Sequence, residues 1–281
     1  MTDVDDLTDD IFDKIRAYIY DRAKISLGDN KRELVRARFG KVIRQRSMSG
    51  FHEYFNWMVK DDTGEAFREV MNAISTNLTS FFRENQHFQF LASTVIPYVA
   101  KNPGSRVGGK IRLRGWSAGC STGEEVYSMC MTICENVPHL DAWDIRLLAT
   151  DIDTEVVAHG QRGLYLKDRL QDVPTATIKR FFDPAKDNKG KPAFQVRSEV
   201  REMVAFRHLN LFSKWPFKHK FDFIFCRNVM IYFDRPTQES LVGNYYNVLN
   251  NGGYLFIGHS ESLNGIKHSF DYSQPTIYLK H

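Results

Sequence analysis

The sequence predicts an α/β domain with a mostly parallel sheet and a small antiparallel β insertion, preceded by an all-helical N-terminal domain. From about residue 110 onward, short and nearly continuous apolar runs alternate with helical stretches, which is typical of a parallel sheet buried on both faces. Residues 1–90 instead show helical periodicity and few strand signals. With 281 residues, 42% of them hydrophobic, the chain can build a sizeable core in one large domain or two smaller ones.

Apolar residues at helical spacing predict the helices of the N-terminal part. They cover residues 11–20, 31–46, 50–60, 64–78 and about 85–100. Residues 101–109 are rich in glycine and other turn residues and mark a break. We therefore expect a helical domain over residues 1–90, a connecting helix and linker over 91–109, and the α/β domain over 110–281.

Four apolar runs predict the strands of the main sheet. They are residues 111–115, 145–151, 221–226 and 252–259. Residues 165–202 depart from this alternation, because a hydrophilic turn at 183–192 precedes a further short run at 193–197. We interpret residues 165–202 as the small antiparallel insertion.

The loop after the first predicted strand carries the strongest functional signal. Residues 116–125 read Trp-Ser-Ala-Gly-Cys-Ser-Thr-Gly-Glu-Glu, which predicts a strand, a tight turn of small residues and a helix. In an open α/β sheet such a turn lies against a nucleotide-like ligand, although a plain structural turn is the alternative for the loop alone. With only Gly119 and Gly123, the fingerprint suits an adenosine ligand without phosphates better than a dinucleotide, which disfavours a nicotinamide-dependent dehydrogenase. Asp151, at the end of the second strand, is placed to reach ribose hydroxyls.

Composition excludes several other classes of protein. No run approaches the roughly 18 apolar residues of a membrane span, and the acidic residues 1–6 are unlike a signal peptide, so we expect a cytoplasmic protein without membrane insertion. The four cysteines form no C-x-x-C pair and accompany no histidine cluster. Neither a metal site nor a disulfide framework is therefore expected.

Positive charge is concentrated near the N-terminus. Residues 14–46 carry eleven Lys or Arg against three acids, a balance of +8. Within the helical run 31–46, Arg38, Lys41 and Arg44 lie on one flank beside the apolar stripe. A solvated helix face is one interpretation of this flank, and a docking surface for an acidic partner is the other. No nucleic-acid fold signature accompanies the charge, so a nucleic-acid partner is not expected.

Four segments together resemble a known family. They are residues 77–84 (Asn-Leu-Thr-Ser-Phe-Phe-Arg-Glu), 116–125, 149–155 and 226–234 (Cys-Arg-Asn-Val-Met-Ile-Tyr-Phe-Asp). In order and spacing the chain resembles the chemoreceptor glutamate methyltransferases, the CheR family, from about residue 10 to its C-terminus. The resemblance implies a Rossmann-like domain that uses S-adenosylmethionine and releases S-adenosylhomocysteine. It implies methyl transfer to glutamates of a chemoreceptor's cytoplasmic helical bundle, giving glutamyl methyl esters in chemotaxis-type adaptation.

The same resemblance implies roles for individual residues. Arg83 would steer the substrate carboxylate and Tyr232 would orient it. Glu125 would bind the amino group of the methionine moiety, with Glu124 as the alternative if the register is shifted by one, and Asp151 would hold the ribose. Arg83 is also implied to contact the cofactor. The other implied cofactor contacts are Asn77, Thr79, Asn210, Leu211, Arg227 and Asn228.

Methyl transfer to a carboxylate needs little catalytic machinery. A glutamate side chain, with an ordinary pKa of about 4.3, is already ionised at neutral pH and needs no general base. Orientation of the carboxylate toward the methyl group can account for roughly 7 to 11 kcal/mol of the barrier. Two alternatives remain open at this point, which are a methyltransferase of another carboxylate or protein, and a non-catalytic module that senses the cofactor.

One segment departs from part of the family. Some members capture a pentapeptide at the receptor's C-terminus by adding it as a strand to the β insertion, and these members tend to carry a glycine- and arginine-rich loop there. Residues 183–191 are instead rich in Lys and Asp, with Gly190 as their one glycine. We therefore expect no dependence on this tether.

Overall fold

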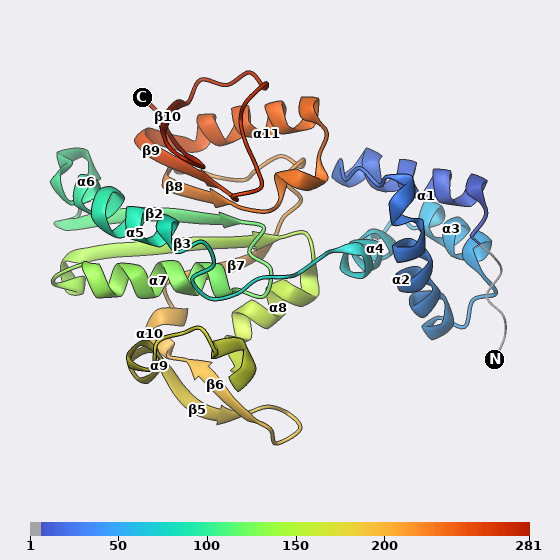
Figure 1. The fold of residues 1–281 in the computed structure, drawn as a ribbon, viewed down its shortest axis with the longest axis horizontal. Coiled ribbons are helices and arrows are strands. Elements are labelled where there is room, and N and C mark those ends of the chain that lie inside the picture. The colour runs from blue at the N-terminus through green and yellow to red at the C-terminus, as the bar shows by residue number, and fades with distance from the viewer. Residues whose placement is uncertain (1–6) are drawn as a thin grey trace.

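The structure, a computed structural model, describes residues 7–281. The acidic residues 1–6, on which part of the signal-peptide argument depends, lie outside the described part of the chain. A helical lobe stands at one side of a larger α/β lobe, and a small sheet lies below the larger one (Figure 1). None of the helices within residues 7–281 has the length and apolar character needed to cross a bilayer.

The helical lobe contains α1 (Asp9–Ala23), α2 (Arg32–Gln45), α3 (Phe51–Lys60) and α4 (Glu65–Ile74), with a short 3-10 turn, η1 (Asp29–Lys31). Their apolar faces meet in a core of their own, with Ile15, Phe39 and Tyr54 fully buried. The last helix is shorter than the predicted 64–78. Ser75 leaves helical geometry, and the Arg38 guanidinium binds the carbonyl oxygens of Ala73 and Ser75 at 3.3 and 2.6 Å.

The predicted connecting helix is present as one continuous helical stretch in three parts. It consists of α5 (Gln86–Phe90), a π-helical turn at η2 (Leu91–Val95) and α6 (Ile96–Lys101), and the 3-10 turn η3 (Pro103–Ser105) follows. Phe88, Leu91 and Val95 are buried in the core of the α/β lobe, so this stretch packs on the sheet.

The main sheet has the strand order β10-β11-β9-β8-β2-β3-β7, and the short β1 (Arg106–Val107) pairs with β2. The parallel strands are β2 (Lys110–Ala118), β3 (Trp143–Asp151), β7 (Val204–His208), β8 (Phe221–Cys226) and β9 (Leu249–Ile257). The antiparallel strands are β10 (Asp271–Gln274) and β11 (Ile277–Leu279). The four predicted strands are confirmed, whereas β7, β10 and β11 were not predicted. Strand β7 buries only Phe206, and β10 buries no residue, so neither shows a clear apolar run.

Helices cover both faces of this sheet. Phe223 and Phe225 of β8 point toward α7 (Glu124–Asn136) and the α5–α6 stretch, while Ile224 points to the opposite core beneath α11 (Arg235–Val248). This alternation follows from the two-residue period of a strand. Helix α8 (Thr154–Arg162) follows β3 and packs on β3 and β7.

The predicted antiparallel insertion is confirmed. Strands β4 (Leu164–Leu166), β6 (Pro192–Val196) and β5 (Phe182–Lys186) form a separate antiparallel sheet in the order β4-β6-β5. Helices α9 (Thr175–Phe181) and α10 (Ser198–Arg201) flank it (Figure 1). The remaining 3-10 turns are η4 (Leu140–Ala142), η5 (Lys167–Leu170) and η6 (Met230–Tyr232).

Candidate active site

A single cavity at the carboxyl edge of the parallel sheet gathers the predicted site residues. Its volume is about 1330 Å³, including the part open to solvent, and residues of the helical lobe close one side of it. All of the residues predicted to bind the cofactor or to act in catalysis line this cavity. They are Asn77, Thr79, Arg83, Glu125, Asp151, Asn210, Leu211, Arg227, Asn228 and Tyr232.

The glycine turn lies at the floor of the cavity. Strand β2 continues to Ala118, three residues beyond the predicted end, so the turn itself is residues 119–123. Gly119 and Gly123 have φ values of +91° and +98°, which side chains other than glycine rarely adopt. A Cβ atom at Gly119 would lie 2.3 Å from Cγ2 of Val229, so this turn needs glycine for space as well as for conformation.

Asp151 is half-buried where β3 ends. Its two carboxylate oxygens accept hydrogen bonds from the backbone N–H groups of Ser121, at 2.9 Å, and Asp153, at 3.0 Å. Burial raises the pKa of Asp151 to about 6, so the group is mostly ionised at neutral pH. An ionised carboxylate has acceptor capacity beyond these two bonds, as a pair of ribose hydroxyls would require.

The structure distinguishes the two neighbouring glutamates at the start of α7. Glu125 lines the cavity and accepts hydrogen bonds from Ser117 Oγ at 2.7 Å and Arg227 Nη1 at 3.0 Å. Burial raises the pKa of Glu125. Glu124 is fully buried in another direction, against Thr122 and Arg169. The residue in position to meet a ligand is therefore Glu125.

Arg227 lines the cavity, but its guanidinium is engaged within the protein, and its predicted contact with the cofactor stays a prediction. Its guanidinium is 2% exposed and forms ion pairs of 3.0 Å with Glu84 and with Glu125. It also donates a hydrogen bond to the carbonyl oxygen of Arg83. These contacts engage most of the donors of the guanidinium, so Arg227 holds Glu125 and the backbone at Arg83 in place.

Asn210 and Asn77 also have their side-chain groups engaged within the protein. Asn210 donates to the carbonyl oxygen of Arg22 at 2.7 Å and accepts from the N–H of Phe212 at 3.0 Å. It therefore joins the helical lobe to the sheet, and one N–H and one lone pair of its amide remain for a ligand. Asn77 donates to Asp153 Oδ2 at 2.8 Å.

Arg83 and Tyr232 both line the cavity, and each is partly exposed. The Arg83 guanidinium donates to the carbonyl oxygen of Leu78 at 3.0 Å, and within residues 7–281 it forms no ion pair. Tyr232 is half-buried at the end of η6, and its carbonyl oxygen accepts from Ser26 N–H at 2.9 Å. A cation without an anionic partner and a phenol thus line the same cavity.

Sequence reasoning missed Glu261, which shapes the turn that carries Tyr232. This buried carboxylate accepts hydrogen bonds from the N–H groups of residues 228–231 and of Gly258. Burial raises its pKa. The only sequence signal is an acid shortly after a strand end, which is too common to have identified it.

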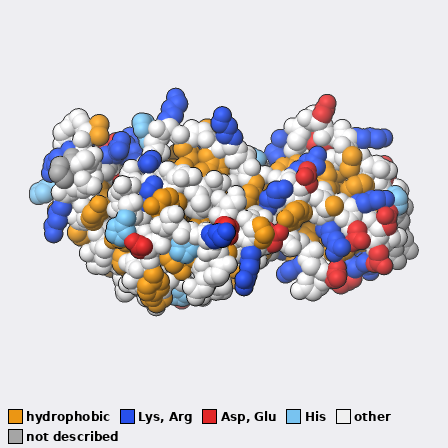
Figure 2. Space-filling view, turned by 90° about the horizontal axis from the view of Figure 1, so that it is seen from above, with side chains coloured by type: hydrophobic (Ala, Val, Ile, Leu, Met, Phe, Trp, Pro, Cys, Tyr) orange, Lys and Arg blue, Asp and Glu red, His pale blue; other side chains and the backbone are white. Residues whose placement is uncertain are grey.

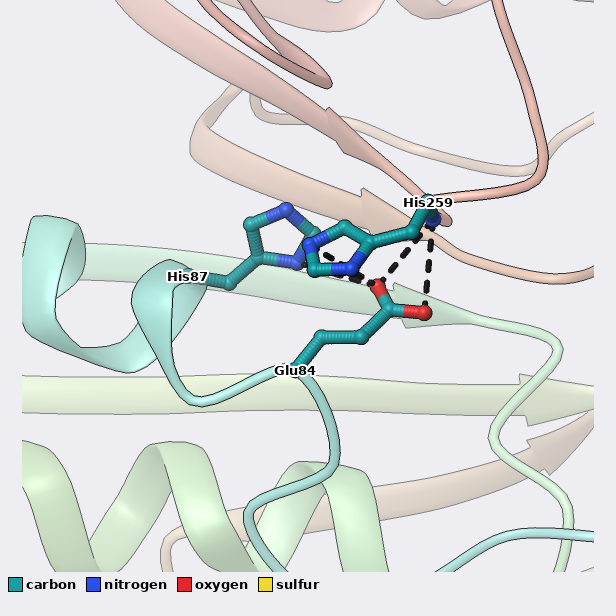
Figure 3. A group of neighbouring side chains, drawn as sticks. All are labelled: Glu84, His87 and His259. Carbon is teal, nitrogen blue, oxygen red and sulfur yellow. Dashed lines mark hydrogen bonds and ion pairs between the residues drawn. The ribbon is translucent and has the colours of Figure 1, made fainter.

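Glu84, His87 and His259 form a cluster of neighbouring side chains (Figure 3), and its carboxylate contacts Arg227. Glu84 Oε2 is 3.7 Å from His87 Nδ1 and 3.8 Å from His259 Nε2, a spacing that a metal ion could bridge. The same oxygen, however, lies 3.0 Å from Arg227 Nη2. Burial, together with the charge of Arg227, lowers the pKa of His87 to about 3, so its ring is neutral. The guanidinium already supplies the cation that Glu84 needs, and the cluster is best described as support for Arg227.

The predicted basic flank of α2 divides into two kinds of residue. Arg38 is half-buried and binds the C-terminal carbonyls of α4, so it has a structural contact in this fold, and its role in partner binding stays a prediction. Lys41 and Arg44 are exposed. Over the helical lobe, Lys and Arg side chains lie among Asp and Glu side chains rather than in one uniform patch (Figure 2).

Comparison with known proteins shows the family of the chain. Residues 77–279 match the family described as CheR methyltransferase, SAM binding domain, and residues 10–75 match CheR methyltransferase, all-alpha domain. The chain is 41% identical to a probable chemotaxis protein methyltransferase of Rhizobium etli over 92% of this chain and 96% of that one. It is 36% identical to a chemotaxis protein methyltransferase of Borreliella burgdorferi (98% and 95%) and 35% identical to that of Escherichia coli (97% and 91%). The chain therefore belongs to the CheR family of S-adenosylmethionine-dependent chemotaxis methyltransferases.

Proposed function

We propose that this methyltransferase esterifies glutamate side chains on the cytoplasmic helical bundle of chemoreceptors and acts in the cytoplasm. The proposal rests on the acids Asp151 and Glu125, the cation Arg83 and the phenol of Tyr232, which line one cavity. In this proposal the two acids form the inner wall around the cofactor, and Arg83 and Tyr232 form the outer side that meets a carboxylate substrate.

The residues of the inner wall fit S-adenosylmethionine. Asp151 has acceptor capacity for the ribose hydroxyls, and Glu125 offers an anion to the ammonium group. Gly119 lines the cavity without a side chain, so a ligand can approach the main chain closely there. Leu211, 9% exposed beside Asn210, gives the adenine an apolar surface. When bound, the cofactor supplies an activated methyl group on a positively charged sulfur.

The outer residues position the nucleophile. Arg83 attracts the substrate carboxylate, and Tyr232 donates a hydrogen bond to the oxygen that does not react. The other oxygen would be left free as the nucleophile toward the methyl group that the bound cofactor would supply. No proton has to be removed, since a glutamate is ionised at neutral pH, with an ordinary pKa of about 4.3. Arg227 fixes the position of the backbone at Arg83 relative to the Glu125 carboxylate, because its guanidinium donates hydrogen bonds to both.

Two features of the surface support receptor docking without the C-terminal tether. Lys41 and Arg44 are exposed on α2 and can attract an acidic bundle over a distance set by the ionic strength. The β5–β6 turn is closed on itself, because Asp187 accepts hydrogen bonds from the N–H groups of Lys189, at 2.9 Å, and Lys191, at 2.7 Å. We propose that Lys41 and Arg44 contribute to docking and that the tether is not required.

The test is a transfer assay with methyl-labelled S-adenosylmethionine and purified receptor cytoplasmic fragments. Label released as volatile methanol by mild alkali identifies a carboxyl methyl ester. We expect labile label that disappears when the receptor glutamates are replaced by alanine. Binding of S-adenosylhomocysteine without any transfer to a panel of receptors would favour a cofactor sensor instead.

Arg83→Ala tests the role of the outer cation. Without Arg83 the carboxylate is poorly oriented, so we expect turnover to fall by about 100-fold or more, as for loss of one oriented donor. Affinity for S-adenosylhomocysteine should change far less than turnover. Arg83→Lys keeps the charge without the planar fork and should recover part of the rate. Near wild-type turnover in Arg83→Ala would remove this residue from the site.

A further inference from the structure

Two of the large apolar side chains most exposed to solvent adjoin the two proposed catalytic residues. Leu78 is 77% exposed and lies on the segment whose carbonyl receives the Arg83 guanidinium. Ile231 is 50% exposed and precedes Tyr232. Both belong to segments that line the active-site cavity. Single exposed apolar residues are common, but these two flank the groups that must meet the substrate.

The backbone holds Leu78 in its exposed position. Three successive carbonyl oxygens of this segment accept hydrogen bonds: that of Asn77 from Ser121 Oγ at 3.1 Å, that of Leu78 from Arg83, and that of Thr79 from Arg169 at 3.0 Å. The Asn77 side chain is also held by Asp153. Because the main chain is fixed on both sides of Leu78, its side chain cannot fold inward without breaking these bonds.

Ile231 is held outward in a comparable way. Its N–H donates to the Glu261 carboxylate at 3.3 Å. The same carboxylate accepts hydrogen bonds from the N–H groups of residues 228–230 in this turn. On its other side, the carbonyl of Tyr232 accepts from Ser26 of the helical lobe. Leu78 and Ile231 are thus presented to water by rigid main chain on segments that are far apart in the sequence.

We propose that Leu78 and Ile231 form an apolar clamp for the helix that carries the substrate glutamate, a role that rests on the proposed function. When a glutamate of a helix enters between Arg83 and Tyr232, the side chains three and four positions away lie on the same helix face. Apolar side chains at those positions would cover Leu78 and Ile231, while the carboxylate meets Arg83. The clamp therefore selects a glutamate with apolar neighbours one helical turn away and disfavours free small acids.

The experiment measures initial methyl-ester formation against receptor-fragment concentration at saturating cofactor, together with the affinity for S-adenosylhomocysteine. Because each truncation removes apolar area from the contact, Leu78→Ala and Ile231→Ala should each raise the KM for the fragment about tenfold. We expect kcat and product affinity to stay within about twofold of wild type. Leu78→Met, which keeps apolar volume, should recover most of the KM.

Controls separate the clamp from a general effect of removing surface apolar groups. Leu140→Ala truncates a leucine that is 40% exposed near the start of β3, at the other edge of the sheet, and Val59→Ala truncates an exposed residue on α3. Both should leave the KM unchanged. Replacing the receptor's apolar residues one turn from the glutamate by serine should raise the KM of wild type but add little to Leu78→Ala.

The outcomes that overturn the proposal are distinct from failure of the proposed function. If wild type forms methyl esters while the clamp variants keep a wild-type KM, the clamp is wrong and the function stands. If product affinity falls as much as the KM rises, Leu78 and Ile231 act on the cofactor site and the clamp is again wrong. If wild type forms no ester with any receptor fragment, the proposed function fails and the clamp falls with it.

Discussion

Two turns at the carboxyl edge of the sheet line the same cavity and are built by different means. The turn after β2, residues 119–123, uses glycines at positive φ, so its shape depends on residue types within the turn. The turn after β8, residues 227–232, contains no glycine, and Asn228 takes the positive φ of 58°. The carboxylate of Glu261, some 30 residues further along the chain, accepts hydrogen bonds from the N–H groups of this turn. The glycines within the first turn determine its shape, whereas a contact with a residue distant in the sequence determines the shape of the second.

The largest effect should come from removing the carboxylate that holds the second turn. Glu261→Ala leaves several buried N–H groups without an acceptor, so we expect the free energy of unfolding to fall by about 3 kcal/mol or more. Glu261→Gln keeps one oxygen but turns an NH₂ group toward N–H donors, and should lie between Ala and wild type. Urea unfolding measures both. A loss below about 1 kcal/mol in Glu261→Ala would mean that the turn is held by other contacts.

A substitution in the first turn, at Gly119, should cause the next largest loss in the free energy of unfolding. Gly119→Ala places a Cβ atom 2.3 Å from Val229 Cγ2 at a φ of +91°, so steric overlap and backbone strain together should cost about 2 to 3 kcal/mol. Val229→Ala in the same chain removes the overlapping methyl groups and leaves only the backbone strain. The double variant should therefore be more stable than the sum of the two single losses. If the loss in the free energy of unfolding of the double variant equals the sum of the two single losses, the two turns are not in contact.

The smallest effect concerns pH at the end of β3, between the two turns. Because the pKa of Asp151 is raised to about 6, its ionised form is lost on acidification, and affinity for S-adenosylhomocysteine should fall up to about tenfold from pH 7 to pH 5. Asp151→Asn should bind more weakly at pH 7 and flatten this dependence. Glu125 also has a raised pKa, so the difference between wild type and Asp151→Asn isolates Asp151.

The raised pKa of Asp151 also affects the stability of the ligand-free protein. Acidification weakens ligand binding but increases this contribution to the free energy of unfolding. A carboxyl whose folded pKa lies above its unfolded value contributes stability below the unfolded pKa, near 4, and that contribution is lost as pH rises through about 6. Urea unfolding of wild type and Asp151→Asn across pH 4 to 7 measures it. A difference between the two proteins that does not change with pH would contradict the raised pKa.

The sequence predicted the sheet well where residue type and local spacing decide the structure. The apolar runs located β2, β3, β8 and β9, and the residues after them had to meet at one edge because the strands are parallel. It failed for β7 and β10, which bury little, and for the end of α4, which Arg38 sets by binding carbonyls from another helix. A weakly buried edge strand carries no pattern to detect.

The sequence by itself determined the family, through four segments in the right order and spacing, and it determined four strands of the main sheet and the place of Asp151 at the end of one of them, since these follow from local patterns. Only the tertiary structure decided which partner each polar side chain takes. It placed Arg227 on Glu84 and Glu125, Asn210 on the helical lobe, and Glu261 on the turn before Tyr232. Each of these contacts joins residues more than 30 positions apart, and a buried polar group takes whichever partner the packing brings within hydrogen-bond distance.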